Sequence, residues 1–62
     1  MYYNIRNKSD YDDKLAQADY AYEHSDWRTA FGYYSACLQY AEANGMSTDY
    51  LEMKVQDCRE KM

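Results

Sequence analysis

The sequence predicts an all-α protein, a small antiparallel three-helix bundle with helices at about residues 10–24, 27–44 and 48–61. The chain of 62 residues has no proline and only two glycines, so few positions interrupt a helix. In three segments, apolar residues recur at i, i+4, i+7 and i+11, the spacing of one helix face. Turn-forming residues separate the segments, and connections this short make consecutive helices antiparallel.

The first segment has one apolar stripe and the end signals of a helix. Ser9 or Asp10 is the expected N-cap, because such side chains accept hydrogen bonds from free backbone N–H groups. Acidic residues follow in the first turn and His24 lies at the end, as the helix dipole favours. The stripe consists of Tyr11, Leu15, Ala18 and Tyr22.

The second segment is apolar over about half of its circumference, which is typical of a central helix with neighbours on two sides. Asp26 is its expected N-cap, and Asn44-Gly45 suits the left-handed residue that ends a helix. One seam consists of Trp27, Phe31, Tyr34, Leu38 and Ala41, and the adjacent seam consists of Ala30, Tyr33, Cys37 and Tyr40.

The third segment begins at Ser47 or Thr48, and Met46 and Leu51 are expected to form a hydrophobic staple around a Ser47 cap. Its stripe consists of Leu51, Val55, Cys58 and Met62. Cys37 and Cys58 both fall on apolar stripes and fit no zinc-ligand spacing, so we expect two reduced core thiols.

Residues 1–8 have no helical period and are interpreted as an N-terminal arm beside a single three-helix domain at residues 9–62. The arm either packs on the bundle, pairs with a second chain or folds on a target. No apolar run could span a membrane, and MYYNIRNKS lacks the apolar core of a signal peptide. These features predict a cytoplasmic location.

The run from Ala18 through SDWRTAFGYYSACL resembles a tetratricopeptide-type (TPR) helical hairpin, with Ala18 and Ala30 at the small positions and Tyr34 at the aromatic position. The resemblance covers about residues 15–45. The microtubule-interacting-and-transport domain, a three-helix bundle, is similar in its element count. Both resemblances imply a binder of proteins or peptides. The sequence departs from the TPR pattern at Lys14, Gln17, Ala21 and Glu42.

The residue pattern favours a protein without catalytic, cofactor-binding or metal-binding residues. His24, Ser25 and Asp26 are adjacent in sequence, whereas a catalytic triad requires side chains that converge in space. The histidine and the cysteines lack metal-ligand spacing, and no glycine-rich loop is present to hold a phosphate. We therefore expect a protein that is not an enzyme.

The acidic composition argues against direct nucleic-acid binding. The net charge is −4, and six of the eleven acids lie between Asp10 and Asp26. Nucleic-acid binding depends on clustered cations. An acidic face of Asp12, Asp19 and Glu23 supports an alternative function: a small inhibitor, such as a mobile-element or phage-encoded antagonist, that blocks a nucleic-acid-handling enzyme. The same face could instead serve only to keep a small protein in solution.

The first hypothesis is a protein–protein interaction module, an adaptor or regulator that binds another protein, a peptide or a second copy of itself. Tyrosine and methionine are enriched in interfaces because they supply adaptable apolar area. The candidate binding residues are Tyr20, Tyr33, Tyr40, Tyr50 and Met53 in the helices, with Tyr2 and Tyr3 in the arm.

Overall fold

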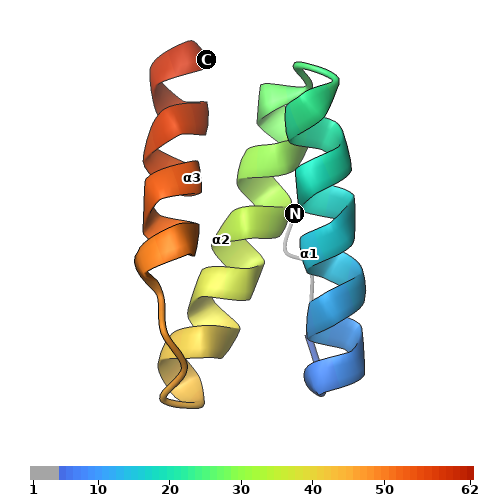
Figure 1. Ribbon diagram of the computed structural model, residues 1–62, viewed down its shortest axis with the longest axis vertical. Helices are drawn as coiled ribbons and strands as arrows, with labels where there is room; N and C mark the ends of the chain where they lie inside the picture. Colours follow the sequence, from blue (N-terminus) through green and yellow to red (C-terminus); the bar gives the residue numbers. More distant parts are fainter. Residues whose placement is uncertain (1–4) are drawn as a thin grey trace.

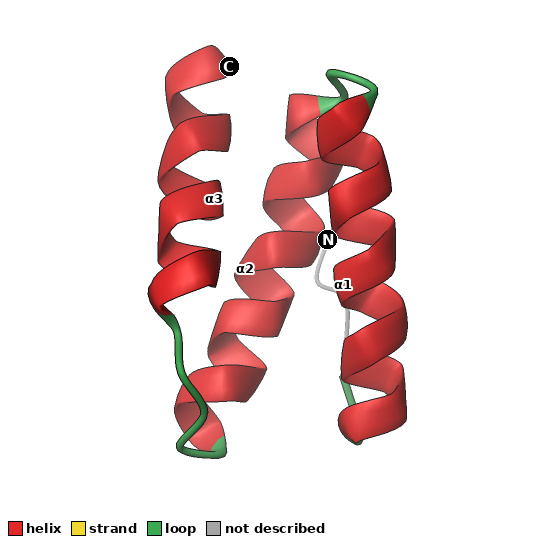
Figure 2. Cartoon of the chain, viewed as in Figure 1, coloured by secondary structure: helices red, strands yellow, loops and turns green. Residues whose placement is uncertain are grey.

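The computed structural model describes residues 5–62 as three antiparallel helices joined by two short connections (Figure 1). Helix α1 spans Lys8–Glu23, α2 spans Trp27–Ala43 and α3 spans Asp49–Lys61. Within this part of the chain there is no strand, and loops connect the helices (Figure 2). The prediction of an all-α three-helix bundle is confirmed.

Helix α2 is the central element, because it packs against both α1 and α3, and its ribbon lies between theirs in Figure 1. The fully buried stripe of α2 runs between the two predicted seams and takes residues from both. It consists of Ala30, Tyr34, Cys37 and Ala41. The remaining seam residues are half-buried and pack against this core, so both seams contribute to packing.

Small side chains dominate the core where α1 meets α2. Ala18 and Ala30, the two small positions of the predicted hairpin, are both completely buried. Small residues allow two helix backbones to approach closely, and the largest fully buried side chain of the same core is Tyr34. The buried hydrophobic residues are Tyr11, Ala18, Ala21, Ala30, Tyr34, Cys37, Ala41, Leu51 and Cys58.

Helix α1 begins earlier than the sequence suggested. Its N-cap is Asn7, whose side-chain oxygen accepts a hydrogen bond of 2.8 Å from the Asp10 backbone N–H. The prediction of a Ser9 or Asp10 cap was therefore wrong, and the last residue of the expected arm, Lys8, is helical. Asparagine caps a helix as well as serine or aspartate does, so the caps could not be ranked by residue type.

The two connections depend on left-handed backbone conformations. Gly45 has φ +68° after the C-cap residue Asn44, which confirms the predicted stop of α2. Ser25 holds φ +60° in the connection between α1 and α2, a conformation that is uncommon for residues with a Cβ atom. Asp26 is the N-cap residue of α2 as expected, although its side chain makes no capping hydrogen bond.

Helix α3 begins after Thr48, one of the two predicted caps, and ends at Lys61 as predicted. Because the N-cap is not Ser47, the staple of Met46 and Leu51 expected around a Ser47 cap was wrong. Met46 instead packs against the core as a half-buried side chain. Met62 was predicted to be in the apolar stripe but is 59% exposed, because α3 ends one residue before it.

The predicted arm is described only from Ile5 onward. Ile5 is half-buried and packs against the core, so this end of the arm is docked on the bundle. Among residues 5–62, no helix is both long enough and apolar enough to cross a membrane.

Candidate protein-binding surface

Three of the predicted binding residues are exposed on the outside of the helices. Tyr20 on α1 is 65% exposed, and Tyr50 and Met53 on α3 are 46% and 59% exposed. The ring of Tyr20 lies against the ring of His24, with centroids 4.2 Å apart. These side chains are large and apolar, and the core does not bury them.

Two other candidates, Tyr33 and Tyr40, take part in the packing of the bundle. Both are half-buried and lie against the core. The ring of Tyr40 stacks on Tyr11 of α1, with centroids 5.3 Å apart and an angle of 28° between the ring planes. Much of their aromatic surface is therefore used in holding α1 to α2. The remaining candidates, Tyr2 and Tyr3, lie outside the described residues.

The three acids of the predicted acidic face have different surroundings. Asp12 is exposed and pairs with Lys8, with 3.2 Å between the ammonium nitrogen and a carboxylate oxygen. Glu23 is also exposed. Asp19 is half-buried, and its Oδ1 atom accepts hydrogen bonds from the hydroxyl groups of Tyr34 and Tyr50, the latter at 2.9 Å.

Asp19 therefore connects all three helices. Its own helix is α1, Tyr34 belongs to α2 and Tyr50 belongs to α3. The rings of Tyr34 and Tyr50 also meet edge to face, with centroids 6.3 Å apart. Asp19 was expected on a solvent-exposed face of α1. The helical period shows which side of its own helix a residue lies on, but not which residues of the other helices it contacts.

A second link joins α1 to α3 closer to the C-terminal ends of both helices. The Tyr22 hydroxyl donates a hydrogen bond to Asp57, and the Lys54 ammonium lies 3.7 Å from the centroid of the Tyr22 ring. Asp57 also pairs with Lys61 at 3.9 Å, and the Lys61 ammonium lies 5.4 Å from the Trp27 ring centroid. We refer to the Tyr50–Asp19 and Tyr22–Asp57 contacts as the tyrosine–aspartate bridges.

The bridges were not predicted, although the sequence contains a signal for them. Asp19 and Tyr22 are three residues apart on α1, and Tyr50 and Asp57 are seven residues apart on α3. Both spacings place side chains on one helix face. Because α1 and α3 run in the same direction, on either side of the α2 that runs opposite to both (Figure 1), an aspartate followed by a tyrosine on α1 can pair twice with a tyrosine followed by an aspartate on α3.

The tyrosine hydroxyls in this region are held in their protonated, hydrogen-bond-donating form. Burial and the neighbouring Asp19 raise the pKa of Tyr34 well above its ordinary value. Burial, followed by the hydrogen bond to Asp19, raises the pKa of Tyr50. The hydrogen bond to Asp57 is the main cause of the raised pKa of Tyr22. At neutral pH all three side chains therefore donate to their carboxylates.

The two cysteines lie in the core, and the His24–Ser25–Asp26 run lies at the junction of α1 and α2. Burial raises the pKa of the Cys37 thiol to about 11, so it is protonated at neutral pH, whereas the thiolate is the nucleophile. Cys37 and Cys58 are buried and unbridged. His24 is the C-cap of α1, with its ring beside Tyr20, whereas Asp26 is the N-cap of α2.

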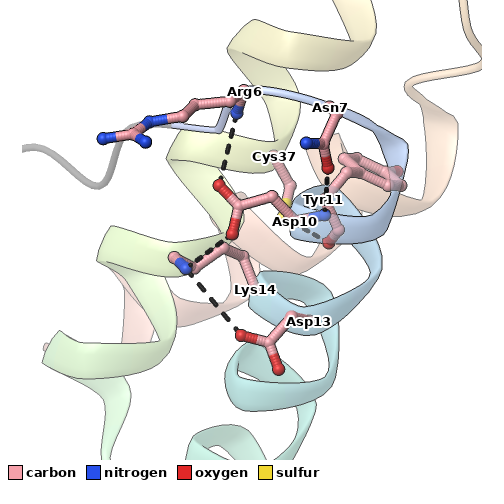
Figure 3. Close-up of polar contacts among 7 residues, drawn as sticks. All are labelled: Arg6, Asn7, Asp10, Tyr11, Asp13, Lys14 and Cys37. Carbon is pink, nitrogen blue, oxygen red and sulfur yellow. Dashed lines mark hydrogen bonds and ion pairs between the residues drawn. The ribbon is translucent and has the colours of Figure 1, made fainter.

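An open hollow lies beside the start of α1, where Asp10, Asp13 and Lys14 are paired with one another while the Arg6 guanidinium points away from them (Figure 3). Asp10 accepts hydrogen bonds from the Arg6 backbone N–H at 3.2 Å and from the Lys14 ammonium at 3.0 Å. The Lys14 contact lowers the pKa of Asp10, and the same contact raises the pKa of Lys14. Residues 5–62 contain no group of three or more potential ligands that could hold a metal ion. This network stabilises the first turns of α1.

Comparisons with protein-family models, with curated proteins and with solved structures give no match for this chain.

Proposed function

We propose that this bundle is a non-enzymatic protein–protein interaction module that recognises its partner mainly through aromatic and apolar side chains. The observation that carries the proposal is the exposure of Tyr20, Tyr50 and Met53. Tyrosine and methionine are enriched in interfaces, where both bury a large apolar area and tyrosine loses little side-chain entropy. The sequence resemblance to TPR-type hairpins, which bind proteins, supports the same function.

The acidic-inhibitor alternative requires Asp12, Asp19 and Glu23 to present free negative charge. Asp19 instead accepts two tyrosine hydroxyls, and Asp12 is compensated by Lys8. Fewer carboxylates of this set are therefore available to imitate a row of phosphates. Because the two cysteines are unbridged, we further propose that the interaction takes place in the cytoplasm, where thiols stay reduced.

The two functions are separated by capturing partners from a source-cell lysate with the tagged chain and washing at low and at high salt. Contacts between exposed charges weaken as salt is added, whereas apolar contacts do not. We expect the main partner to remain bound at high salt. A nucleic-acid-handling enzyme that leaves at high salt would contradict the proposal and support the inhibitor.

Two matched double variants identify the surface responsible. Tyr20→Ser with Met53→Ser removes exposed apolar area, and Asp12→Asn with Glu23→Gln removes exposed charge; both variants leave Asp19 and the core unchanged. The first variant should lose the partner and the second should retain it. Circular dichroism of both variants checks that their helix content is that of the wild type.

A further inference from the structure

Helices α2 and α3 share an outer edge that faces away from α1. On α2, the Tyr40 ring stacks on α1, and Phe31, nine residues earlier, lies about 180° around the helix from it. On α3, Tyr50 bonds to α1, and Val55, five residues later, lies about 140° around the helix from it. Phe31 and Val55 are half-buried and pack against the core, so each leaves part of its apolar surface at this edge.

Two arginines border the same edge without an acidic partner. Arg28 lies three residues before Phe31, and Arg59 lies four residues after Val55. Both spacings keep side chains on one helix face. The two arginines are exposed, and every ion pair within residues 5–62 is made by a lysine instead. We refer to Arg28, Phe31, Val55 and Arg59 as the arginine edge.

The outward side of α1 has the complementary chemistry. Tyr20 is 65% exposed and lies about 200° around α1 from the fully buried Ala18, so its ring points away from the core. Glu23, three residues later on the same face, is exposed and makes no ion pair within residues 5–62. The His24 ring lies against Tyr20 and widens the aromatic surface. We refer to Tyr20, Glu23 and His24 as the α1 outer face.

From this complementarity we infer that the chain binds a second copy of itself head to tail, with the α1 outer face of one copy against the arginine edge of the next. Tyr20 covers the apolar surface that Phe31 and Val55 leave at the edge. A guanidinium group pairs with Glu23, and arginine also stacks on tyrosine rings, so both halves of the face fit the edge. This inference rests on the proposed function and names its partner.

The contact joins different copies, because the two surfaces lie on opposite sides of one bundle. The arginine edge faces away from α1, whereas the α1 outer face points away from the core that α1 shares with α2. A contact between two unlike surfaces leaves one of each unfilled in every pair, so copies add in a row or close into a ring. The apolar centre resists salt, and the charges around it fix the orientation.

The test uses two variants of the whole chain, each of which removes one surface. Arg28→Glu with Arg59→Glu reverses the arginine edge and keeps the α1 outer face, and Tyr20→Ser with Glu23→Arg does the opposite. All four side chains are exposed, so the core is unchanged. Arg6→Glu is the matched control, because Arg6 is an exposed arginine outside both surfaces. Sedimentation equilibrium over a series of concentrations measures association.

We expect the wild-type chain and the Arg6→Glu control to associate beyond the dimer as concentration rises. Each surface variant alone should lose at least about tenfold in association constant, because like charges then face each other or the aromatic contact is missing. An equal mixture of the two variants should form a one-to-one complex that does not grow, since each supplies the surface that the other lacks. Circular dichroism checks helix content, and Arg59→Glu and Glu23→Arg alone serve where a double variant unfolds.

A wild-type chain that stays monomeric at every concentration would overturn the inference, as would loss of association in the Arg6→Glu control or a mixture that fails to combine. A surface variant that dimerises by itself would indicate a symmetric contact and overturn it as well. A monomeric wild-type chain that still retains a salt-resistant protein in the lysate experiment would preserve the proposed function and remove only the self-association.

Discussion

Ser25 holds a backbone conformation that its side chain disfavours. It has φ +60°, where a Cβ atom is close to the neighbouring carbonyl group. We expect Ser25→Gly to raise the free energy of unfolding by about 0.5–1 kcal/mol, because glycine adopts this conformation without that strain. Urea denaturation of both chains measures the change.

Gly45 provides the opposite test at the other connection. Its φ is +68°, and a Cβ atom placed there meets nothing within 4 Å, so any cost of Gly45→Ala is conformational rather than steric crowding by neighbours. The free energy of unfolding should fall by about 1 kcal/mol. A change of the same sign at Ser25 and Gly45 would contradict the assignment of strain to these turns.

Ala30 lies where α2 contacts the rest of the core and is completely buried. We expect Ala30→Leu to lower the free energy of unfolding by about 1–3 kcal/mol, because three added carbon atoms must displace packed neighbours. Ala43→Leu is the matched control, since Ala43 is exposed on the same helix. Similar midpoints of chemical denaturation for the two variants would show that the core is not closely packed at Ala30.

Tyr34 links the central helix to Asp19 through its buried hydroxyl group. Tyr34→Phe keeps the ring and removes the donor, so Asp19 retains only the hydrogen bond from Tyr50. We expect a loss of about 1–2 kcal/mol in the free energy of unfolding. Tyr20→Phe, at an exposed ring, should change it little, and equal losses for the two variants would argue against a structural role for the Asp19 contacts.

The helices themselves were predictable because their signals are local. The stripes of α1 and α2 and the Asn44-Gly45 stop all lie within single segments, and the structure confirms a central α2 between two neighbours. The wide apolar surface of α2 also predicted its two contacts. The helix starts were less predictable, because Asn7, Ser9 and Asp10 are equally good caps by residue type.

The candidate surface was only partly predictable, because its composition depends on contacts between helices. Tyr20 and Met53 are exposed as expected. In contrast, the Tyr40 ring stacks on Tyr11, and Asp19 accepts hydrogen bonds from two tyrosines. A helical period gives the direction of a side chain and leaves the partner undetermined. The bridges required knowledge of how α1 and α3 are placed relative to each other.

The stability of the whole bundle should decline at alkaline pH. Burial raises the pKa of Cys37 from 9.0 to about 11, and the pKa of Tyr34 is raised in the same direction. Between the unfolded and folded pKa of Cys37, the folded chain binds more protons than the unfolded chain. The stability present below pH 9 is therefore lost as the pH rises to 11. A shift of this size corresponds to roughly 2–3 kcal/mol from Cys37 alone.

Urea denaturation at a series of pH values measures this decline. The free energy of unfolding should change little between about pH 7 and 8.5 and then fall toward pH 11. Cys37→Ala should show a shallower fall, whatever its stability at neutral pH. A wild-type curve that stays level up to pH 11 would contradict the assigned pKa directions.

Helix α3 has two fully buried residues, Leu51 and Cys58, and is joined to α1 by the two tyrosine–aspartate bridges. Its role as a separately opening part of the bundle is tested most directly by hydrogen exchange of the backbone amides in the wild-type chain and in a Tyr50→Phe, Asp57→Asn variant. We expect the α3 amides to open at a lower free energy than the core amides of α1 and α2, and the variant to accelerate exchange in α3 alone. Uniform protection of all three helices, with all of them accelerated together in the variant, would show instead that the bundle opens as a single unit.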